Sequence, residues 1–215
     1  MMKIRILFAK TGALRFIGHL DFLRVFGQML RRTGLPLAYS QGFNPHILLG
    51  FALPLPLGMA STNDYADLTF AAKTNLDEAA KLMQTHAPEG LQIRRIWEYE
   101  GRAAASVAFA ADYTFEGVIK TDLLSAPEYI IAKKTKSGIK NTDIRPDIFA
   151  IYNEGAQIKM RLAAGSGRFL NPLTVAQIIT GREVLASEVV RAELYAQVGE
   201  GFVGLGAGGA ARLNG

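Results

Sequence analysis

The sequence contains no cysteine among its 215 residues. This absence excludes disulfide bonds, cysteine-ligated zinc and iron–sulfur clusters from the chain itself. A chain without cysteine also fits a reducing compartment.

Long hydrophobic runs are missing too. Charged residues interrupt the N-terminal segment MMKIRILFAKTGALRF too often for it to contain the hydrophobic region of a signal peptide. The longest apolar run without charge, residues 47–63, contains two prolines and several polar residues, which is untypical of a membrane span. We therefore expect a soluble, cytoplasmic protein.

The sequence has few groups suited to catalysis. It contains no Walker loop, dinucleotide-binding glycine pattern, nucleophile elbow or HExxH motif, and only three histidines. His19 and His46 flank a predicted helix whose ends lie about 20 Å apart, so they do not suggest a shared metal. We expect no metal and no cofactor. His19 alone is a candidate general acid or base, with a local structural role at the helix N-terminus as the favoured alternative.

The charge is distributed unevenly. The formal net charge is +5, but residues 1–63 hold seven basic side chains and one acid. A second basic segment, residues 133–145, carries Lys133, Lys134, Lys136, Lys140 and Arg145 against Asp143. Two separate basic segments favour binding to a polyanion over a charge that merely keeps the protein soluble.

Hydrophobic periodicity in the first half predicts the order β-α-β-β-α-β, the split βαβ unit of ferredoxin-like folds. The predicted strands and helices cover residues 3–9, 19–32, 47–53, 65–71, 75–86 and 91–98. Asp64 and Asp67 would point to opposite faces of the strand at 65–71, so they do not form a carboxylate pair.

The second half predicts the same order, with strands at 112–119, 129–135, 156–163 and 188–197 and helices at 121–126 and 172–181. Residues 147–152 are an additional possible strand. The fold class is therefore predicted as α+β, with tandem ferredoxin-like modules and antiparallel sheets at 1–101 and 107–198. Residues 199–215 include seven glycines and are expected to be a disordered tail.

Residues 36–46, PLAYSQGFNPH, form the most distinctive segment, with aromatic and polar residues but no acid. Tyr39 and Phe43 are suited to stacking on bases, and Gln41, Asn44 and His46 to contacting base edges. Arg15, Arg24, Arg31 and Arg32 are candidates for phosphate contacts. The alternative is a connection in which the aromatic rings pack on the sheet.

The sequence TDIRPD contains a second motif, in which Asp143 and Arg145 are two residues apart. Such a pair fits either a structural clamp in a turn or a polar edge of a binding site. The residues alone leave both interpretations open.

The segments GHLD, YSQGFNPH and LPLPLG, in this order, resemble the N-terminal signature of the radical SAM-linked protein family, and DIRP resembles its second motif. Members of this family are bacterial domains of unknown function encoded beside or fused to a radical SAM enzyme. The resemblance implies a radical SAM enzyme as partner. Without cysteine, this chain cannot itself hold that enzyme's cluster.

Three functions fit these observations. The first is an accessory adaptor that binds RNA or another substrate for a radical SAM enzyme, in RNA modification or processing. The second is a metal-independent endoribonuclease that uses His19, by analogy with the ferredoxin-like processing enzymes of CRISPR systems. The third is a protein-interaction domain that docks onto a partner enzyme.

Overall fold

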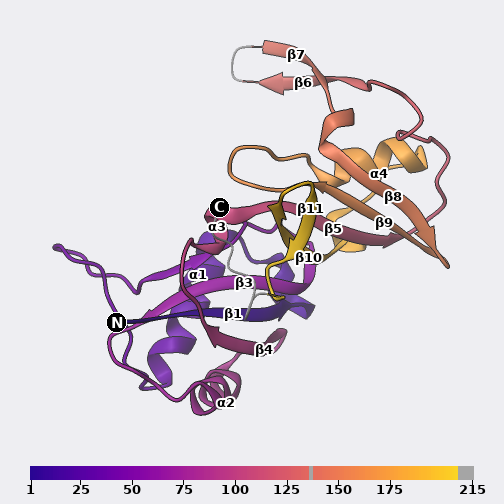
Figure 1. Cartoon of the computed structure of the whole chain (residues 1–215). Coiled ribbons are helices and arrows are strands. Elements are labelled where there is room, and N and C mark those ends of the chain that lie inside the picture. Colours follow the sequence, from indigo (N-terminus) through magenta and orange to yellow (C-terminus); the bar gives the residue numbers. More distant parts are fainter. Residues whose placement is uncertain (136–137, 208–215) are drawn as a thin grey trace.

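The computed structural model describes residues 1–135 and 138–207 as a mixed α+β structure (Figure 1). Most strands join one nine-stranded, mainly antiparallel sheet, and four α-helices are present among the described residues. A separate two-stranded sheet projects from the body. None of the described helices has the length and hydrophobicity needed to cross a lipid bilayer.

The first half follows the predicted order of elements. Its strands pair antiparallel in the order β4-β1-β3, with the short β2 on the other edge of β3. The elements are β1 (Met2–Lys10), α1 (His19–Arg32), β2 (Leu49–Phe51), β3 (Ala60–Phe70), α2 (Leu76–His86) and β4 (Leu91–Glu98).

The two helices of this half form for reasons visible in the sequence. Phe22, Phe26 and Leu30 recur at helical spacing on α1 and are buried in the first core. The side chain of Asn75 caps α2 by accepting hydrogen bonds from the backbone N–H groups of Asp77 and Glu78. The predicted limits of α1, residues 19–32, are confirmed.

The second half adds strands to the same sheet in the order β10-β5-β9-β8. Proline at the first turn and a left-handed Gly181 at the end delimit its helix as the sequence predicts. The elements are α3 (Ala104–Val107), β5 (Ala108–Glu116), β8 (Ile148–Glu154), β9 (Gln157–Ala163), α4 (Pro172–Thr180), β10 (Val190–Val198) and β11 (Gly201–Gly204).

The helix expected at residues 121–126 does not form. The carboxylate of Asp122 accepts hydrogen bonds from the backbone N–H groups of Leu124 and Ser125, which gives this segment a local turn in place of a helix. Pro127 follows directly and further disfavours helix continuation. The prediction of a helix was therefore wrong.

The strand expected at 129–135 is present but lies outside the main sheet. It forms β6 (Ile130–Thr135) and pairs only with β7 (Gly138–Asp143), in the projecting two-stranded sheet. We refer to this pair of strands as the β6–β7 ribbon. The additional strand suggested at 147–152 is β8, and it belongs to the main sheet.

The glycine-rich tail is partly ordered, against expectation. β11 pairs antiparallel with β10, and Leu205 beyond it is buried in the second core. Pairing with the edge of β10 satisfies backbone groups in spite of the glycine content. Residues 208–215 of the predicted tail lie outside the described residues.

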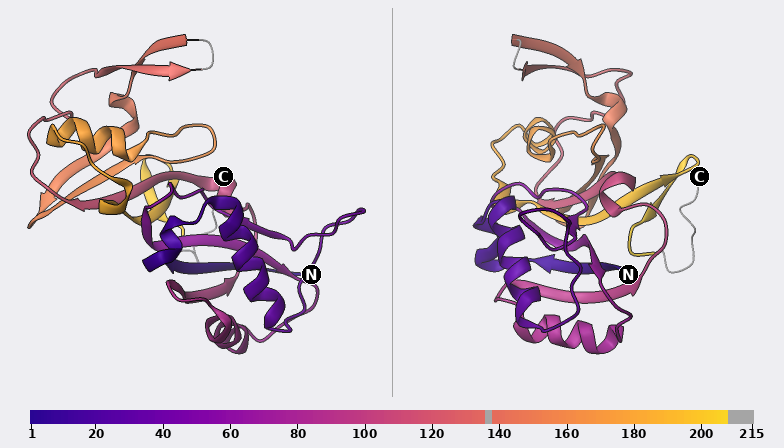
Figure 2. Two further views of the ribbon diagram at one scale, coloured as in Figure 1. Left: turned by 180° about the vertical axis from the view of Figure 1, so that it is seen from behind. Right: turned by 90° about the vertical axis from the view of Figure 1, so that its left-hand side faces the viewer.

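The two halves join where β3 and β10 run parallel. Ala60 pairs with Val190 and Ser61 with Arg191, which makes the sheet continuous through both halves. One buried core gathers around α1 and α2, and the second around α4. Figure 2 shows these helices from two further sides. The division into modules at 1–101 and 107–198 stays a prediction.

Polar side chains cross the sheet in one row at this junction. Lys10 of β1 lies opposite Ser61, Ser61 lies opposite Arg191, and Arg191 lies opposite Tyr113 of β5. Paired residues in neighbouring strands point to the same face, and all four are buried. We call these residues, together with Asp64, the junction cluster.

Arg191 is the best-connected member of the junction cluster. One terminal nitrogen lies 2.6 Å from the Asp64 carboxylate, and the guanidinium also donates to the backbone carbonyls of Leu53 and Pro54. Its side chain is completely buried, and that of Asp64 is almost so. The pair therefore ties β3, β10 and the segment after β2 together.

Replacing Arg191 with leucine leaves Asp64 buried without its main partner. The free energy of unfolding, measured by urea denaturation, should fall by about 3–5 kcal/mol. The double variant Arg191→Leu, Asp64→Leu removes both charges and should recover a large part of that loss, because no carboxylate remains unpaired. An equal loss in the single and double variants would contradict the assignment.

Candidate functional site

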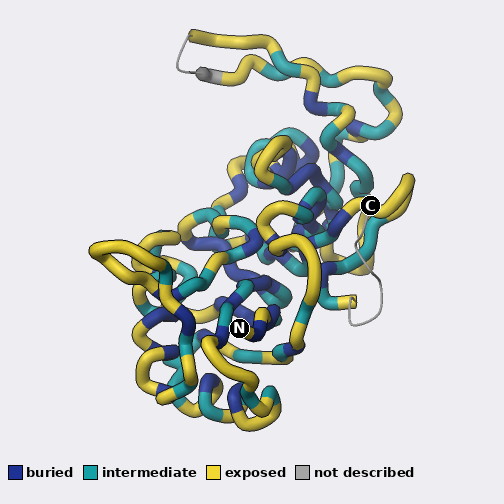
Figure 3. The backbone as a smooth tube through the Cα atoms, turned by 60° about the vertical axis from the view of Figure 1, so that its left-hand side comes forward, coloured by how far each residue is buried: buried dark blue, intermediate teal, exposed yellow. Residues whose placement is uncertain are grey.

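The segment 36–46 forms a loop that projects from the body of the protein (Figure 3). Its root is closed by an isolated bridge between Tyr39 and Ile47 and by a 2.8 Å hydrogen bond from the Ser40 backbone N–H to the His46 carbonyl. Leu37 forms a second bridge, to Phe70 of β3. The loop is thus anchored on the sheet while residues 41–46 are exposed.

The tip of the loop presents an aromatic ring to solvent. Phe43 is fully exposed, and the side chain of Tyr39 is 43% exposed. Gly42 has a φ of 118°, a conformation that favours glycine and turns the chain at the tip. Gln41 and Asn44 are exposed beside Phe43. The predicted stacking and polar residues are therefore exposed on the same loop, and Phe43 does not pack on the sheet.

His46 has a local partner. Its Nδ1 lies 2.8 Å from the Ser40 hydroxyl oxygen, which also accepts a hydrogen bond from the His46 backbone N–H at 3.1 Å. The tautomer of the ring sets which of the two atoms donates, and in either tautomer Nε2 is left as the nitrogen for a binding partner. Ser40 therefore orients the imidazole, which suits recognition.

The four predicted phosphate-binding arginines are not gathered in one place. Arg31 lies at the root of the loop. A Cβ atom built on Gly27 would lie 3.8 Å from the Arg31 guanidinium and 3.8 Å from the Ile47 side chain, so both groups lie close to Gly27. Arg32 is exposed at the end of α1, and Arg24 is exposed but pairs with Asp21 at 2.7 Å.

Arg15 lies elsewhere. Its guanidinium donates to the Ser187 carbonyl at 3.2 Å and lies over the ring of Phe16. Arg15 thereby connects η1 (Gly12–Phe16) with η3 (Ala186–Glu188) in the second half. The Arg15 side chain therefore links the two halves through this hydrogen bond.

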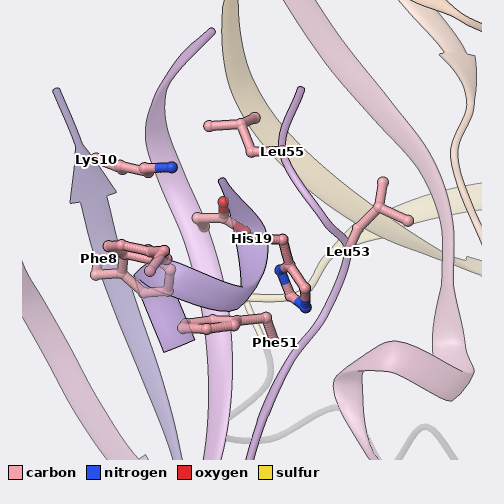
Figure 4. A pocket seen from close by; sticks show the side chains of 8 residues that line it. Phe8, Lys10, His19, Phe51, Leu53 and Leu55 are labelled. Carbon is pink, nitrogen blue, oxygen red and sulfur yellow. The ribbon is translucent and has the colours of Figure 1, made fainter. Parts of the chain in front are cut away.

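His19 lies at the rim of a small pocket between α1 and β1 (Figure 4). The imidazole is exposed, and its ring centre lies 5.7 Å from that of Phe51. Lys10 and Asp64 also line the pocket, and the rest of the wall is apolar. The interior offers about 10 Å³ to the centre of a water molecule, room for about one water.

Lys10 is the buried cation of this pocket. Its ammonium group donates to the Ile17 carbonyl at 3.1 Å and lies 4.5 Å from the ring centre of Phe22. Burial lowers the pKa of Lys10, while the nearby Asp64 carboxylate acts in the opposite direction. The pocket thus places a buried amine near the rim histidine.

The junction cluster was not predicted from the sequence, although the sequence contains part of its signal. Lys10 continues the alternation of Ile4, Ile6 and Phe8, all of which are buried. A lysine in phase with an inward-facing row indicates a buried charge. Arg191 gave no such signal, because its partner Asp64 is 127 residues away in the sequence.

Asp64 and Asp67 have separate partners, as their spacing predicts. Asp64 contacts Arg191, and Asp67 receives a two-pronged hydrogen bond from Arg5 on β1. The two carboxylates therefore do not form a pair with each other. Among the described residues, no group of three or more His, Asp or Glu side chains is placed to hold a metal ion.

Asp143 and Arg145 make the contacts of a structural clamp at the root of the β6–β7 ribbon. One Asp143 carboxylate oxygen accepts hydrogen bonds from the backbone N–H groups of Tyr129 and Arg145 at 2.8 and 3.0 Å. These bonds lower the pKa of Asp143. The Arg145 guanidinium donates to the carbonyls of Ile148 and Leu124.

Replacing Asp143 with alanine removes the acceptor shared by the two N–H groups. We expect faster hydrogen exchange at the amides of Tyr129 and Arg145, with the exchange of β1 and β3 unchanged. Asp143→Asn retains an acceptor oxygen and should exchange nearly as slowly as the wild type. Equal protection in the alanine variant would show that Asp143 does not hold the root.

A comparison with protein families finds a match that covers most of the features described above. A family model described as an uncharacterized protein conserved in bacteria (DUF2344) matches residues 3–172. The match includes the projecting loop, the junction residues of β1 and β3, and the clamp at the ribbon root. No curated protein matches the chain.

Proposed function

The chain belongs to the DUF2344 family of uncharacterized proteins conserved in bacteria, and we propose that it is an RNA-binding adaptor that acts with a radical SAM enzyme. In this proposal the loop 36–46 contacts bases, the nearby basic residues hold the phosphate backbone, and the partner enzyme performs the chemistry in the cytoplasm.

The observation that carries this proposal is the full exposure of Phe43 at the tip of an anchored loop. A fully exposed aromatic ring buries no apolar surface and so does not stabilise the fold, whereas stacking on a base stabilises binding by about 1–3 kcal/mol. Gln41 and Asn44 beside it supply donors and acceptors for base edges.

The charge around the loop supports the same ligand. The segment 36–46 contains no acid, and Arg31 lies at its root with Arg32 close by on the helix. A cationic surface attracts the phosphate backbone regardless of sequence, with an affinity that falls as salt rises.

The direct test is RNA binding by the full chain. Phe43→Ala should weaken binding to a mixed-sequence single-stranded RNA by about 5- to 150-fold, the equivalent of one lost stacking contact. Fluorescence anisotropy over a salt series measures both the affinity and its salt dependence.

The matched control is Tyr152→Ala, which removes an exposed aromatic ring on β8, away from the loop. It should bind RNA like the wild type. A flat salt dependence, or equal affinities for wild type and Phe43→Ala, would rule out the proposed role of the loop.

The partnership with a radical SAM enzyme rests on the resemblance of the loop and DIRP motifs. The chain has no cysteine, so any iron–sulfur cluster must belong to the partner. Co-purification with that enzyme tests the partnership. A complex that survives both nuclease and high salt would instead favour the protein-interaction alternative, since RNA bridging and surface charge are then excluded.

A second candidate is endoribonuclease activity at His19. The observation in its favour is the pocket that His19 shares with Lys10, a buried amine whose pKa is lowered by burial.

His19→Ala decides this candidate. Incubation of total RNA with wild type in the presence of EDTA should give cleavage that the variant loses, if His19 acts as acid or base. Equal cleavage by both proteins, or none by either, would remove His19 from any mechanism.

We also propose that the two halves are tandem ferredoxin-like units. The order β10-β5-β9-β8 in the second half repeats the order β4-β1-β3-β2 of the first, with α4 in the place of α2. The second unit would then carry the β6–β7 ribbon in place of its first helix.

A further inference from the structure

The β6–β7 ribbon stands apart from the rest of the molecule. β6 and β7 pair only with each other, and both strands extend away from the body (Figures 1 and 2). Two-stranded ribbons without a covering layer are marginally stable in water. The stability of the fold therefore does not account for the residues of the β6–β7 ribbon.

The pairing within the ribbon brings like charges together. Lys133 lies directly opposite Lys140, on the same face of the ribbon. Like charges in opposite positions destabilise a strand pair. Among the described residues, no ion pair involves either lysine, so the repulsion is not offset within the described chain.

Exposed hydrophobic residues accompany the lysines. Ile130 and Ile139 are 56% and 78% exposed, although isoleucine is usually buried in strands. The ribbon thus combines positive charge with exposed apolar side chains.

The root of the ribbon, in contrast, is firmly held. Asp143 and Arg145 bond to backbone groups on both sides, and Ile144 between them is buried in the second core. The root therefore fixes the direction of the ribbon, and Ile131 of β6 packs against the second core beside it. Lys133 and Lys140, farther along the ribbon, are exposed. This arrangement suits an arm that meets a partner.

In Figure 1 the loop 36–46 projects at the left of the first half, and the ribbon lies at the top of the second half with its strands running toward the same left-hand side. The loop supplies aromatic and polar groups, and the ribbon supplies ammonium groups on long stems. A single extended ligand with bases and phosphates is complementary to both surfaces.

We infer that the β6–β7 ribbon is a second RNA contact, in which Lys133 and Lys140 bind neighbouring phosphates of the RNA held by the loop. This inference rests on the proposed RNA-binding function. Phosphates between or beside the two ammonium groups remove the repulsion across the ribbon, so RNA binding also stabilises the arm.

The test compares Lys133→Gln, Lys140→Gln with wild type in the same anisotropy assay, using single-stranded RNA. Loss of two phosphate contacts should lower the affinity and reduce the slope of log affinity against log salt by about 1.4 in magnitude. Phe43→Ala should weaken binding without changing this slope, because stacking releases no counterions.

Two controls accompany this variant. Lys73→Gln, Lys81→Gln removes two exposed lysines near α2 in the first half and should leave the slope unchanged. Lys133→Arg, Lys140→Arg keeps the charge and should retain the wild-type slope. Both glutamine variants replace exposed residues, and removal of the Lys133–Lys140 repulsion should not destabilise the ribbon.

The outcomes separate the two proposals. RNA binding by wild type with an equal slope in the ribbon variant overturns the inference but leaves the adaptor function standing. Absence of RNA binding by wild type overturns both. A ribbon variant that binds RNA normally but no longer retains the partner enzyme also overturns the inference, because the arm then docks a protein.

Discussion

The architecture depends on the buried ion pair between Asp64 and Arg191. β3 and β10 are paired over only two residues, yet this short parallel contact joins both halves into one sheet. Arg191 strengthens it by bonding to Asp64 and to the carbonyls of Leu53 and Pro54. Because a buried guanidinium without these acceptors is strongly unfavourable, the pair specifies how the two halves meet.

That constraint decides which parts of the chain remain free for function. With both cores closed against one continuous sheet, the loop at 36–46 and the β6–β7 ribbon are two segments that leave it. Each has a rigid root, a bridge at Tyr39 in one case and the Asp143 clamp in the other. Both carry side chains that do little for the fold, which is why we assign them to recognition.

The elements with strong local signals were predictable. The apolar spacing of α1, the Asn75 cap of α2 and the Pro172 and Gly181 limits of α4 are all encoded within a few neighbouring residues. The helix expected at 121–126 failed because the Asp122 side chain competes for the backbone N–H groups. The ordered part of the tail was missed because its stability comes from pairing with β10.

The sequence by itself determined the absence of cysteine chemistry, the two basic segments and the alternation that turns Lys10 inward. It also marked residues 36–46 as unusual. Only the tertiary structure decided that Phe43 is exposed, that Arg15 binds Ser187 and that Lys133 faces Lys140. These outcomes depend on strand pairing and on contacts between distant residues, which no local pattern of side chains specifies.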